Sequence, residues 1–201
     1  MKCKYYQKCG ACLYDLGDYA ASIKDKKAKL KRMFKEDFAF YAMDDPYHSR
    51  HKVTFSFYKD KGIIKSGLYA QNSRKVIAIK DCPLQSKTAN ALIASIDELA
   101  NAFKLSVFDP LSKKGLLRHV QIRVASDDQK ALLTFVLGEK IFPSSRNFIK
   151  ELTKCHKEIV GIVFNYNFRH TAVVLGESDK VVYGKDSLED KMGDLTFTIS
   201  S

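Results

Sequence analysis

The sequence has no run of about 18 to 20 consecutive apolar residues, the length that a membrane-spanning helix requires. Its N-terminus also lacks the basic-then-apolar order of a secretory signal peptide. No Gly-x-Gly-x-x-Gly motif, and no other glycine-rich loop, follows a predicted strand, so the sequence offers no cradle for a nucleotide cofactor. We therefore expect a cytoplasmic protein without a membrane partner, whose thiols stay reduced.

The composition is that of a folded protein with a basic surface. Of the 201 residues, 45% are hydrophobic and 28% are charged, which suits one domain or a small module plus a domain. Lysine and arginine exceed aspartate and glutamate by 34 − 23 = 11 residues. Phosphate backbones favour such a surplus, so nucleic acid is the leading class of partner; a solvated basic face is the alternative. We expect a monomer.

The first 36 residues predict a module of their own, made of a cysteine-rich metal loop followed by a basic amphipathic helix. Apolar residues recur at helical spacing between Tyr19 and Lys35, at Ala20, Ile23, Leu30 and Phe34. Basic residues fill the positions between them, at Lys24, Lys26, Lys27, Lys29, Lys31 and Arg32. The basic side of this helix is either solvated or in contact with phosphates.

Residues 37–201 predict an α+β domain with a mostly antiparallel sheet and two main helices. Alternating polar and apolar residues indicate strands, and Lys61-Gly62 supplies a hairpin turn. The predicted strands are 52–58, 63–69, 75–79, 118–125, 130–137, 159–166 and 171–176. The predicted helices are 86–103, capped by Ser86, and 145–156. Hairpins punctuated by single helices are typical of the α+β class.

Four of the five cysteines form a pattern that suits a metal site. Cys3, Cys9 and Cys12 lie close together, and Cys82 follows some seventy residues later, before a proline. Four thiolates from one compact run and one distant position favour a four-iron, four-sulfur cluster over structural zinc, with unligated thiols as a third possibility. Cys155, on the second predicted helix with Phe148 and Leu152, is interpreted as a buried, inert thiol.

At these cysteines the sequence resembles the RNA 5-methyluridine methyltransferases, in particular the iron–sulfur type that methylates 23S ribosomal RNA. The resemblance covers nearly the whole chain. It is carried by Cys3-x5-Cys9-Gly10-Ala11-Cys12-x-Tyr14, Tyr47-His48-Ser49-Arg50-His51-Lys52, Asp81-Cys82-Pro83-Leu84, Leu117-Arg118-His119-Val120-x-x-Arg123, Val182-Tyr183-Gly184-Lys185 and the closing strand Leu195 to Ser200.

The resemblance implies a 4Fe–4S cluster on Cys3, Cys9, Cys12 and Cys82, with Cys82 completing the site from the second domain. It also implies S-adenosylmethionine as the cofactor of the complete enzyme, bound by a Rossmann-like C-terminal domain that we expect to be missing from this sequence. In such enzymes a cysteine attacks uracil and a carboxylate removes a proton, and both belong to that domain. We therefore expect no catalytic or cofactor-binding residue here, and a chain that is inactive alone.

The residues expected to contact RNA are Arg50, Lys52, His119 and Arg123. Arg50 and Lys52 open one predicted strand, and His119, Gln121 and Arg123 alternate on the polar side of another. If these strands are neighbours, one face carries Lys52, His119 and Arg123 together; an ordinary solvated sheet surface is the alternative. The expected partner is RNA, with ribosomal RNA favoured over transfer RNA. The competing function is a stand-alone RNA-binding module with a structural zinc site, and an electron-transfer protein is a weaker alternative.

Overall fold

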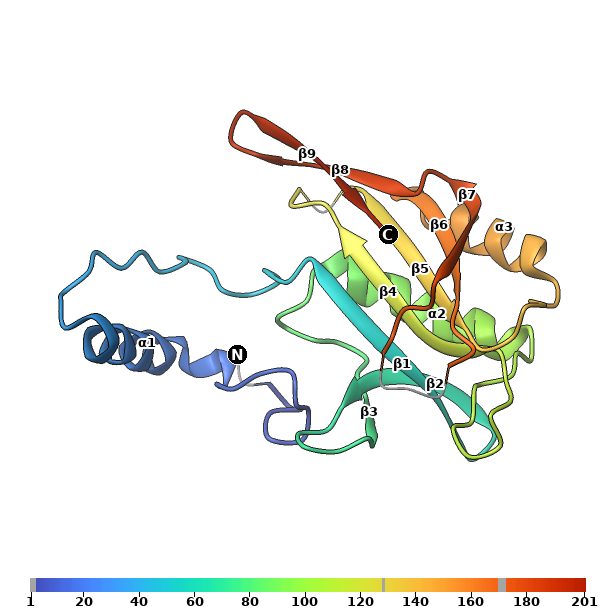
Figure 1. Cartoon of the computed structure of the whole chain (residues 1–201), viewed down its shortest axis with the longest axis horizontal. Helices are drawn as coiled ribbons and strands as arrows, with labels where there is room; N and C mark the ends of the chain where they lie inside the picture. The colour runs from blue at the N-terminus through green and yellow to red at the C-terminus, as the bar shows by residue number, and fades with distance from the viewer. Residues whose placement is uncertain (1–2, 128, 170–172) are drawn as a thin grey trace.

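The structure is a computed structural model that describes residues 3–127, 129–169 and 173–201. One large sheet forms its body, and a basic helix projects from that body (Figure 1). The elements in chain order are η1 (Leu16–Asp18), α1 (Tyr19–Phe34), β1 (Lys52–Asp60), β2 (Ile63–Tyr69), β3 (Val76–Ala78), α2 (Lys87–Ala102), β4 (Leu117–Val124), β5 (Ala131–Leu137), α3 (Ser145–Cys155), β6 (Ile159–Tyr166), β7 (Ser178–Gly184), β8 (Ser187–Met192) and β9 (Leu195–Ser200).

The large sheet has seven strands in the order β3-β2-β1-β4-β5-β6-β7, and β8 and β9 form a separate hairpin. All neighbours in the large sheet are antiparallel except β5 and β6, which are parallel and joined through α3. A parallel pair needs such a crossover because its strands cannot be joined by a tight turn. The predicted α+β class with a mostly antiparallel sheet is confirmed.

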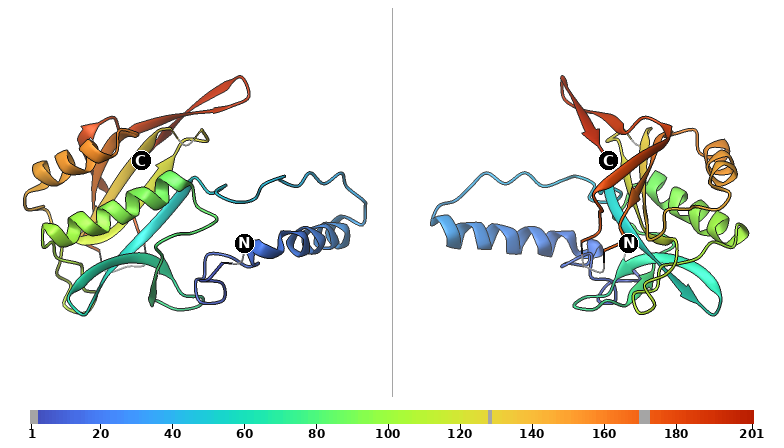
Figure 2. Two further views of the ribbon diagram at one scale, coloured as in Figure 1. Left: turned by 180° about the vertical axis from the view of Figure 1, so that it is seen from behind. Right: turned by 45° about the vertical axis from the view of Figure 1, so that its right-hand side comes forward.

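Helices α2 and α3 cover one face of the large sheet and enclose the core, as the view from behind shows (Figure 2). Leu92 and Ile96 of α2 and Phe148 of α3 are fully buried against Phe55 and Phe135 of the sheet. The α2 helix begins where the sequence predicts, because the Ser86 hydroxyl accepts the Ala89 N–H. The strand of alternating residues that starts near Lys52 places its apolar positions on this covered face.

The turn between β1 and β2 also follows the prediction. Lys61 and Gly62 both have positive φ, 48° and 84°, as a two-residue hairpin turn of the type that matches strand twist requires. Glycine adopts this conformation without steric cost.

The end of α3 differs from the prediction for Cys155. The thiol is exposed rather than buried, because Cys155 is the last residue of the helix and lies beyond the core that Phe148 and Leu152 fill. His156 takes the inward position instead. Its Nε2 is 2.8 Å from Ser95 Oγ on α2, and its Nδ1 is 2.8 Å from Glu158 Oε1 beside β6. This hydrogen-bonded chain joins both helices to the sheet.

The sequence predicted a strand at 171–176. Residues 170–172 lie outside the described residues, and for the described residues of that range the prediction is wrong. Residues 173–176 are not a strand. The side-chain amide of Asn167 donates to the carbonyls of Val173 and Val174, and that of Asn165 exchanges hydrogen bonds with the backbone of Gly176. Side chains therefore satisfy backbone groups that a ladder would otherwise pair. The strand that pairs with β6 is β7.

The β8–β9 hairpin packs on part of the second face of the large sheet. Leu188 of β8 is buried with Ala125, Leu132 and Val163, and Asp190 accepts hydrogen bonds from the backbone and hydroxyl of Ser126. The apolar part of the second face is thus covered. The polar part, over β1 and β4, carries three of the four residues predicted to contact RNA, Lys52, His119 and Arg123.

The predicted basic helix exists as α1 and stands apart from the sheet (Figures 1 and 2). Ser22 is its one buried residue. Across the described ranges, no helix combines the length and apolarity needed to cross a bilayer.

Candidate metal centre and nucleic-acid interface

Residues 3–15, here named the cysteine loop, are ordered mainly by backbone hydrogen bonds. Within the loop, the N–H of Cys9 donates to the Tyr5 carbonyl at 2.8 Å, and the N–H of Cys3 donates to the Asp15 carboxylate. The N–H of Gly10 reaches the carbonyl of Tyr69 on β2 at 2.9 Å. These bonds attach the loop to the end of the sheet that β2 and β3 form.

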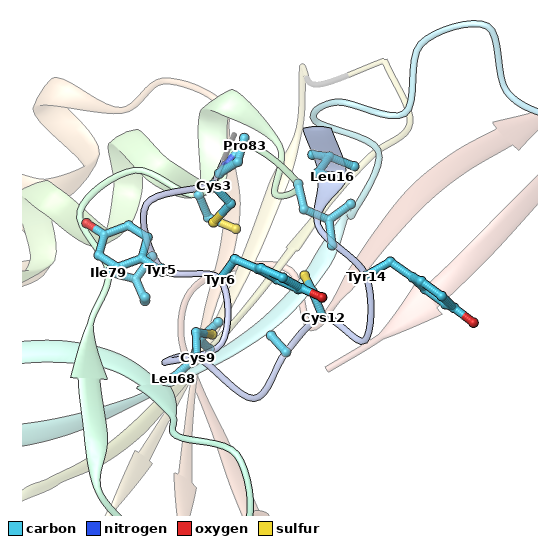
Figure 3. A pocket seen from close by; sticks show the side chains of 13 residues that line it. Cys3, Tyr5, Tyr6, Cys9, Cys12, Tyr14, Leu16, Leu68, Ile79 and Pro83 are labelled. Atoms are coloured by element: carbon cyan, nitrogen blue, oxygen red, sulfur yellow. The ribbon is translucent and has the colours of Figure 1, made fainter. Parts of the chain in front are cut away.

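The four predicted ligands all line one pocket, here named the cysteine pocket. Figure 3 shows the side chains of Cys3, Cys9 and Cys12 that line it from the loop, and Cys82 joins them from the segment after β3. The remaining lining is largely aromatic or aliphatic, with Tyr5, Tyr6 and Ile79 among it. The pocket is partly open to solvent, and its cavity volume is about 20 Å³. All four cysteines are free of disulfide bonds.

Arg50 is a cation beside this pocket. Its guanidinium donates to the Ala11 carbonyl in the cysteine loop at 3.2 Å, and its backbone bonds with Leu84 and Ser86 on either side of Gln85. Burial raises the pKa of the Cys12 thiol, while the nearby Arg50 charge acts to lower it. Burial likewise raises the pKa of Cys82, and the backbone N–H groups of Leu84 and Gln85 oppose that effect. The pocket therefore contains groups that stabilise bound thiolates.

The donor set suits an iron–sulfur cluster by its chemistry. A zinc ion takes four ligands at about 2.0 to 2.3 Å from a single point. Among the residues that the structure describes, no three His, Cys, Asp or Glu side chains are grouped so that they could hold one metal ion. A cluster instead takes one thiolate on each of four iron atoms, which spreads the sulfur ligands around a larger body. Four thiols line one pocket, so the type and number of donors match those that hold a cluster.

The second candidate site is the polar part of the second sheet face, here named the polar face. Strand β1 pairs with β4 so that Lys52 lies opposite Arg123, Thr54 opposite Gln121, and Ser56 opposite His119. Directly opposite residues of an antiparallel pair share a face. Three of the four predicted RNA contacts, Lys52, His119 and Arg123, thus lie on one face of neighbouring strands.

Lys52 and Arg123 form an uncompensated pair of positive charges. Like charges directly opposite each other destabilise a sheet. Within the described ranges neither residue has an ion-pair partner. The buried Nε of Arg123 and the buried Nε2 of Gln121 also have no acceptor among the described residues. The polar face therefore carries positive charge from Lys52 and Arg123, which suits a negatively charged ligand.

His119 contributes no charge to this face at neutral pH. Its Nδ1 is 3.0 Å from the Ser56 hydroxyl, and burial, aided by the neighbouring Arg118, lowers the pKa of His119 to about 4. The imidazole is therefore neutral and holds β1 against β4 rather than neutralising a phosphate.

Arg50 lies apart from the other three predicted contacts. It precedes β1 and pairs with Gln85 in an isolated bridge, so its guanidinium belongs to the cysteine pocket. The sequence grouped it with Lys52 as one of two basic residues that open the predicted strand. Alternation predicts faces only within a strand, and β1 begins at Lys52.

Arg118 has a structural role that the sequence did not indicate. A register shift between Leu117 and His119 interrupts the β4–β5 pairing, and Arg118 at that point is buried. Its guanidinium lies 4.3 Å from the centre of the Phe108 ring and donates to the carbonyls of Asn167 and Arg169. It fastens the chain that follows β6, which a strand pattern alone does not reveal.

The fold is that of a known RNA-modifying enzyme. The crystal structure of the Pyrococcus abyssi tRNA (uracil-54, C5)-methyltransferase in complex with S-adenosyl-L-homocysteine matches 91% of this chain with a TM-score of 0.73 and 20% sequence identity. The match covers 42% of that protein. At this identity the likeness shows the fold.

The sequence relatives carry the same kind of name. Proteins named uncharacterized RNA methyltransferases from Clostridium tetani, Clostridium acetobutylicum and Oceanobacillus iheyensis are 31%, 32% and 30% identical over 98%, 99% and 96% of this chain. The chain spans a little under half the length of each, 45%, 45% and 44%. No family model matches the chain. Its homologues are thus proteins named RNA methyltransferases.

The lowered pKa of His119 predicts a pH-dependent stability. The folded protein binds fewer protons than the unfolded chain between pH 6.5 and about 4, so this stabilising contribution is present above pH 6.5 and is lost as the pH falls towards 4. His119→Gln should remove about 1 to 3 kcal/mol of that pH dependence. Urea unfolding of both proteins at several pH values measures it; parallel curves of unfolding free energy against pH would contradict the assignment.

Proposed function

We propose that this chain is the RNA-recognition and iron–sulfur portion of an S-adenosylmethionine-dependent RNA uracil-C5 methyltransferase acting on ribosomal RNA. The observation that carries the proposal is the pairing of Lys52 with Arg123 on a polar face with unsatisfied donors. Two cations placed opposite each other weaken the sheet, and a polyanion bound across them removes that cost. The fold of a tRNA (uracil-54, C5)-methyltransferase and the named relatives supply the reaction class.

The polar face suits unstacked RNA. Sequence-selective RNA binding uses loops and splayed bases, and an enzyme that modifies a uracil ring must draw the base out of its stack. Lys52 and Arg123, which lie directly opposite each other, would contact phosphates. His119 positions β4 for these contacts through Ser56.

Cys3, Cys9, Cys12 and Cys82 would hold a 4Fe–4S cluster in the cysteine pocket. The cluster would supply a structural cross-link there, because it joins the loop to the segment after β3. Arg50 favours the thiolate forms and ties the loop to the start of β1 through Ala11. The chain's own residues thus connect the cysteine pocket to the polar face.

Methyl transfer needs groups other than those that this chain brings together. Cys155, the thiol outside the cysteine pocket, lies on α3 and hence on the helix-covered side of the sheet, opposite the polar face. A uracil held on the polar face is out of its reach. We therefore propose that the remaining half of the length seen in the relatives supplies the methyl donor site and the nucleophile.

Neutralising the polar face should weaken RNA binding in a salt-dependent manner. For a uridine-containing stem-loop, Arg123→Ala or Lys52→Ala should each lower the slope of log affinity against log salt by about 0.7 to 0.9, the effect of one phosphate contact. Lys180→Ala on β7, which is exposed, is the matched control. Fluorescence anisotropy across a salt series measures the slopes, and equal slopes for all variants would remove RNA contact from this face.

The cysteine pocket should bind iron and sulfide. After anaerobic reconstitution the chain should hold about four iron and four sulfide ions, with visible charge-transfer absorption. Cys82→Ser should lose most of this absorption and unfold more easily, while Cys155→Ser should match the wild type. One zinc per chain with no iron uptake would instead support the stand-alone module with structural zinc.

The 201-residue chain should show no measurable affinity for S-adenosylmethionine. The sequence contains no glycine-rich nucleotide loop, and a cofactor of this size needs a preformed concave site with convergent polar groups. Isothermal titration calorimetry tests this, with the same preparation shown to bind the stem-loop RNA. Saturable heat at micromolar cofactor would overturn the placement of the methyl donor site.

A further inference from the structure

Residues 19–43, here named the arm, comprise α1 and the extended segment that returns along it (Figure 2). Segment 36–40 lines a groove with Lys27, Ala28, Leu30 and Lys31 of α1. Two hydrogen bonds hold the arm's shape at its base: Tyr14 bonds with Asp25, and the Met43 N–H donates to the Tyr19 hydroxyl at 3.1 Å. The arm thus leaves the body at the cysteine loop and is exposed along its length.

The arm is strongly basic. It contains seven lysine or arginine residues and three acidic residues, a net charge of 7 − 3 = +4. Two of the acidic residues already have partners, since Asp25 bonds with Tyr14 and Asp37 pairs with Lys31 at 2.9 Å. For Lys26, Lys29 and Arg32, the described part of the chain contains no ion-pair partner.

These three cations form a row. They stand at positions i, i+3 and i+6 of α1, so they follow one side of the helix, and none of them lines the groove that segment 36–40 occupies. Like charges at i, i+3 destabilise a helix. A polyanion along this side would relieve the repulsion, because its phosphates recur at a spacing that a row of basic side chains can follow.

Exposed aromatic rings lie along the arm. Phe34 is 57% exposed, and its ring centroid lies 5.4 Å from that of Phe38, which is 47% exposed. Tyr41 on the return segment is 93% exposed. Large exposed rings beside unpaired cations are the combination that holds single-stranded nucleic acid, in which bases stack on rings and phosphates meet positive charge.

We propose that the arm is a second RNA-binding surface, which grips a single strand flanking the part of the RNA held on the polar face. Lys26, Lys29 and Arg32 bind its phosphates, and Phe34 and Tyr41 stack on its bases. The inference rests on the proposed function, since it assumes that RNA is the partner. The arm is then a binding site separate from the sheet, and its ligand is an RNA strand without base pairing.

The test compares two triple variants of the full chain. Lys26→Gln/Lys29→Gln/Arg32→Gln neutralises the row on α1, and Arg146→Gln/Lys150→Gln/Lys154→Gln neutralises two lysines and one arginine that are exposed on α3. Both are measured on a uridine-containing stem-loop with and without a single-stranded oligouridine extension, across a salt series. Glutamine retains helix propensity, and circular dichroism checks that α1 persists.

On the extended RNA, the slope of log affinity against log salt should be smaller by roughly 2 for the α1 variant, about 0.7 for each of three single-strand contacts. The α3 variant should keep the wild-type slope. On the bare stem-loop both should resemble the wild type. Tyr41→Ala should weaken binding of the extended RNA roughly tenfold at an unchanged slope, since a stacked base is worth about 1 to 3 kcal/mol.

Four results would overturn the proposal. Equal slopes for wild type and both triple variants would make the row a solvated face. Binding to phosphatidylserine vesicles that the α1 variant loses, without any RNA effect, would make the arm a lipid-binding surface. Failure of the wild type to bind any of the RNAs would refute the proposed function itself. A slope lowered by Arg123→Ala but not by the α1 variant would refute only the RNA-binding role of the arm.

Discussion

The pairing of β1 with β4 is the contact on which the rest of the structure depends. These strands belong to different halves of the chain, separated by β2, β3 and α2, and their antiparallel register joins the halves into one sheet. The register sets Lys52 against Arg123 and Ser56 against His119, and a slip of β1 by one residue would move Lys52 and Ser56 to the helix-covered face. It also fixes where β1 begins, and hence where Arg50 meets the cysteine loop.

Much of this sheet could be predicted because local sequence and tertiary burial agree along it. Three features follow from nearby residues: the alternation that begins at Lys52, the Lys61-Gly62 turn and the Ser86 helix cap. In each of them the local sequence and the backbone hydrogen bonding favour the same conformation. The segment after β6 was missed because Asn165 and Asn167 hold its backbone through their side chains. A hydrophobic pattern does not distinguish such bonding from a ladder. Cys155 was misplaced because helical spacing predicts a face but does not show where the core ends.

The candidate site could likewise be predicted only in part from the sequence. Spacing brought Cys3, Cys9, Cys12 and Cys82 together as candidates, and they line one pocket. The charges around them depend on contacts between distant segments, which no single-sequence pattern contains. Arg50 donates to the cysteine loop, and His119 is neutral because burial lowers its pKa. Arg118 fastens residues 167–169 only because the β4 register shifts beside it.

The cysteine loop connects both proposed RNA surfaces. It reaches the sheet through a backbone bond from Gly10 and through Arg50, and it continues through η1 into the arm. These few bonds are weak against the conformational entropy of a short segment with little buried apolar surface. A cross-link between Cys12 and Cys82 closes a loop of about 70 residues, for which loop-closure entropy makes a tether worth several kcal/mol. Metal binding would therefore fix the direction in which α1 leaves the body, and with it the path of an RNA strand from the polar face to the arm.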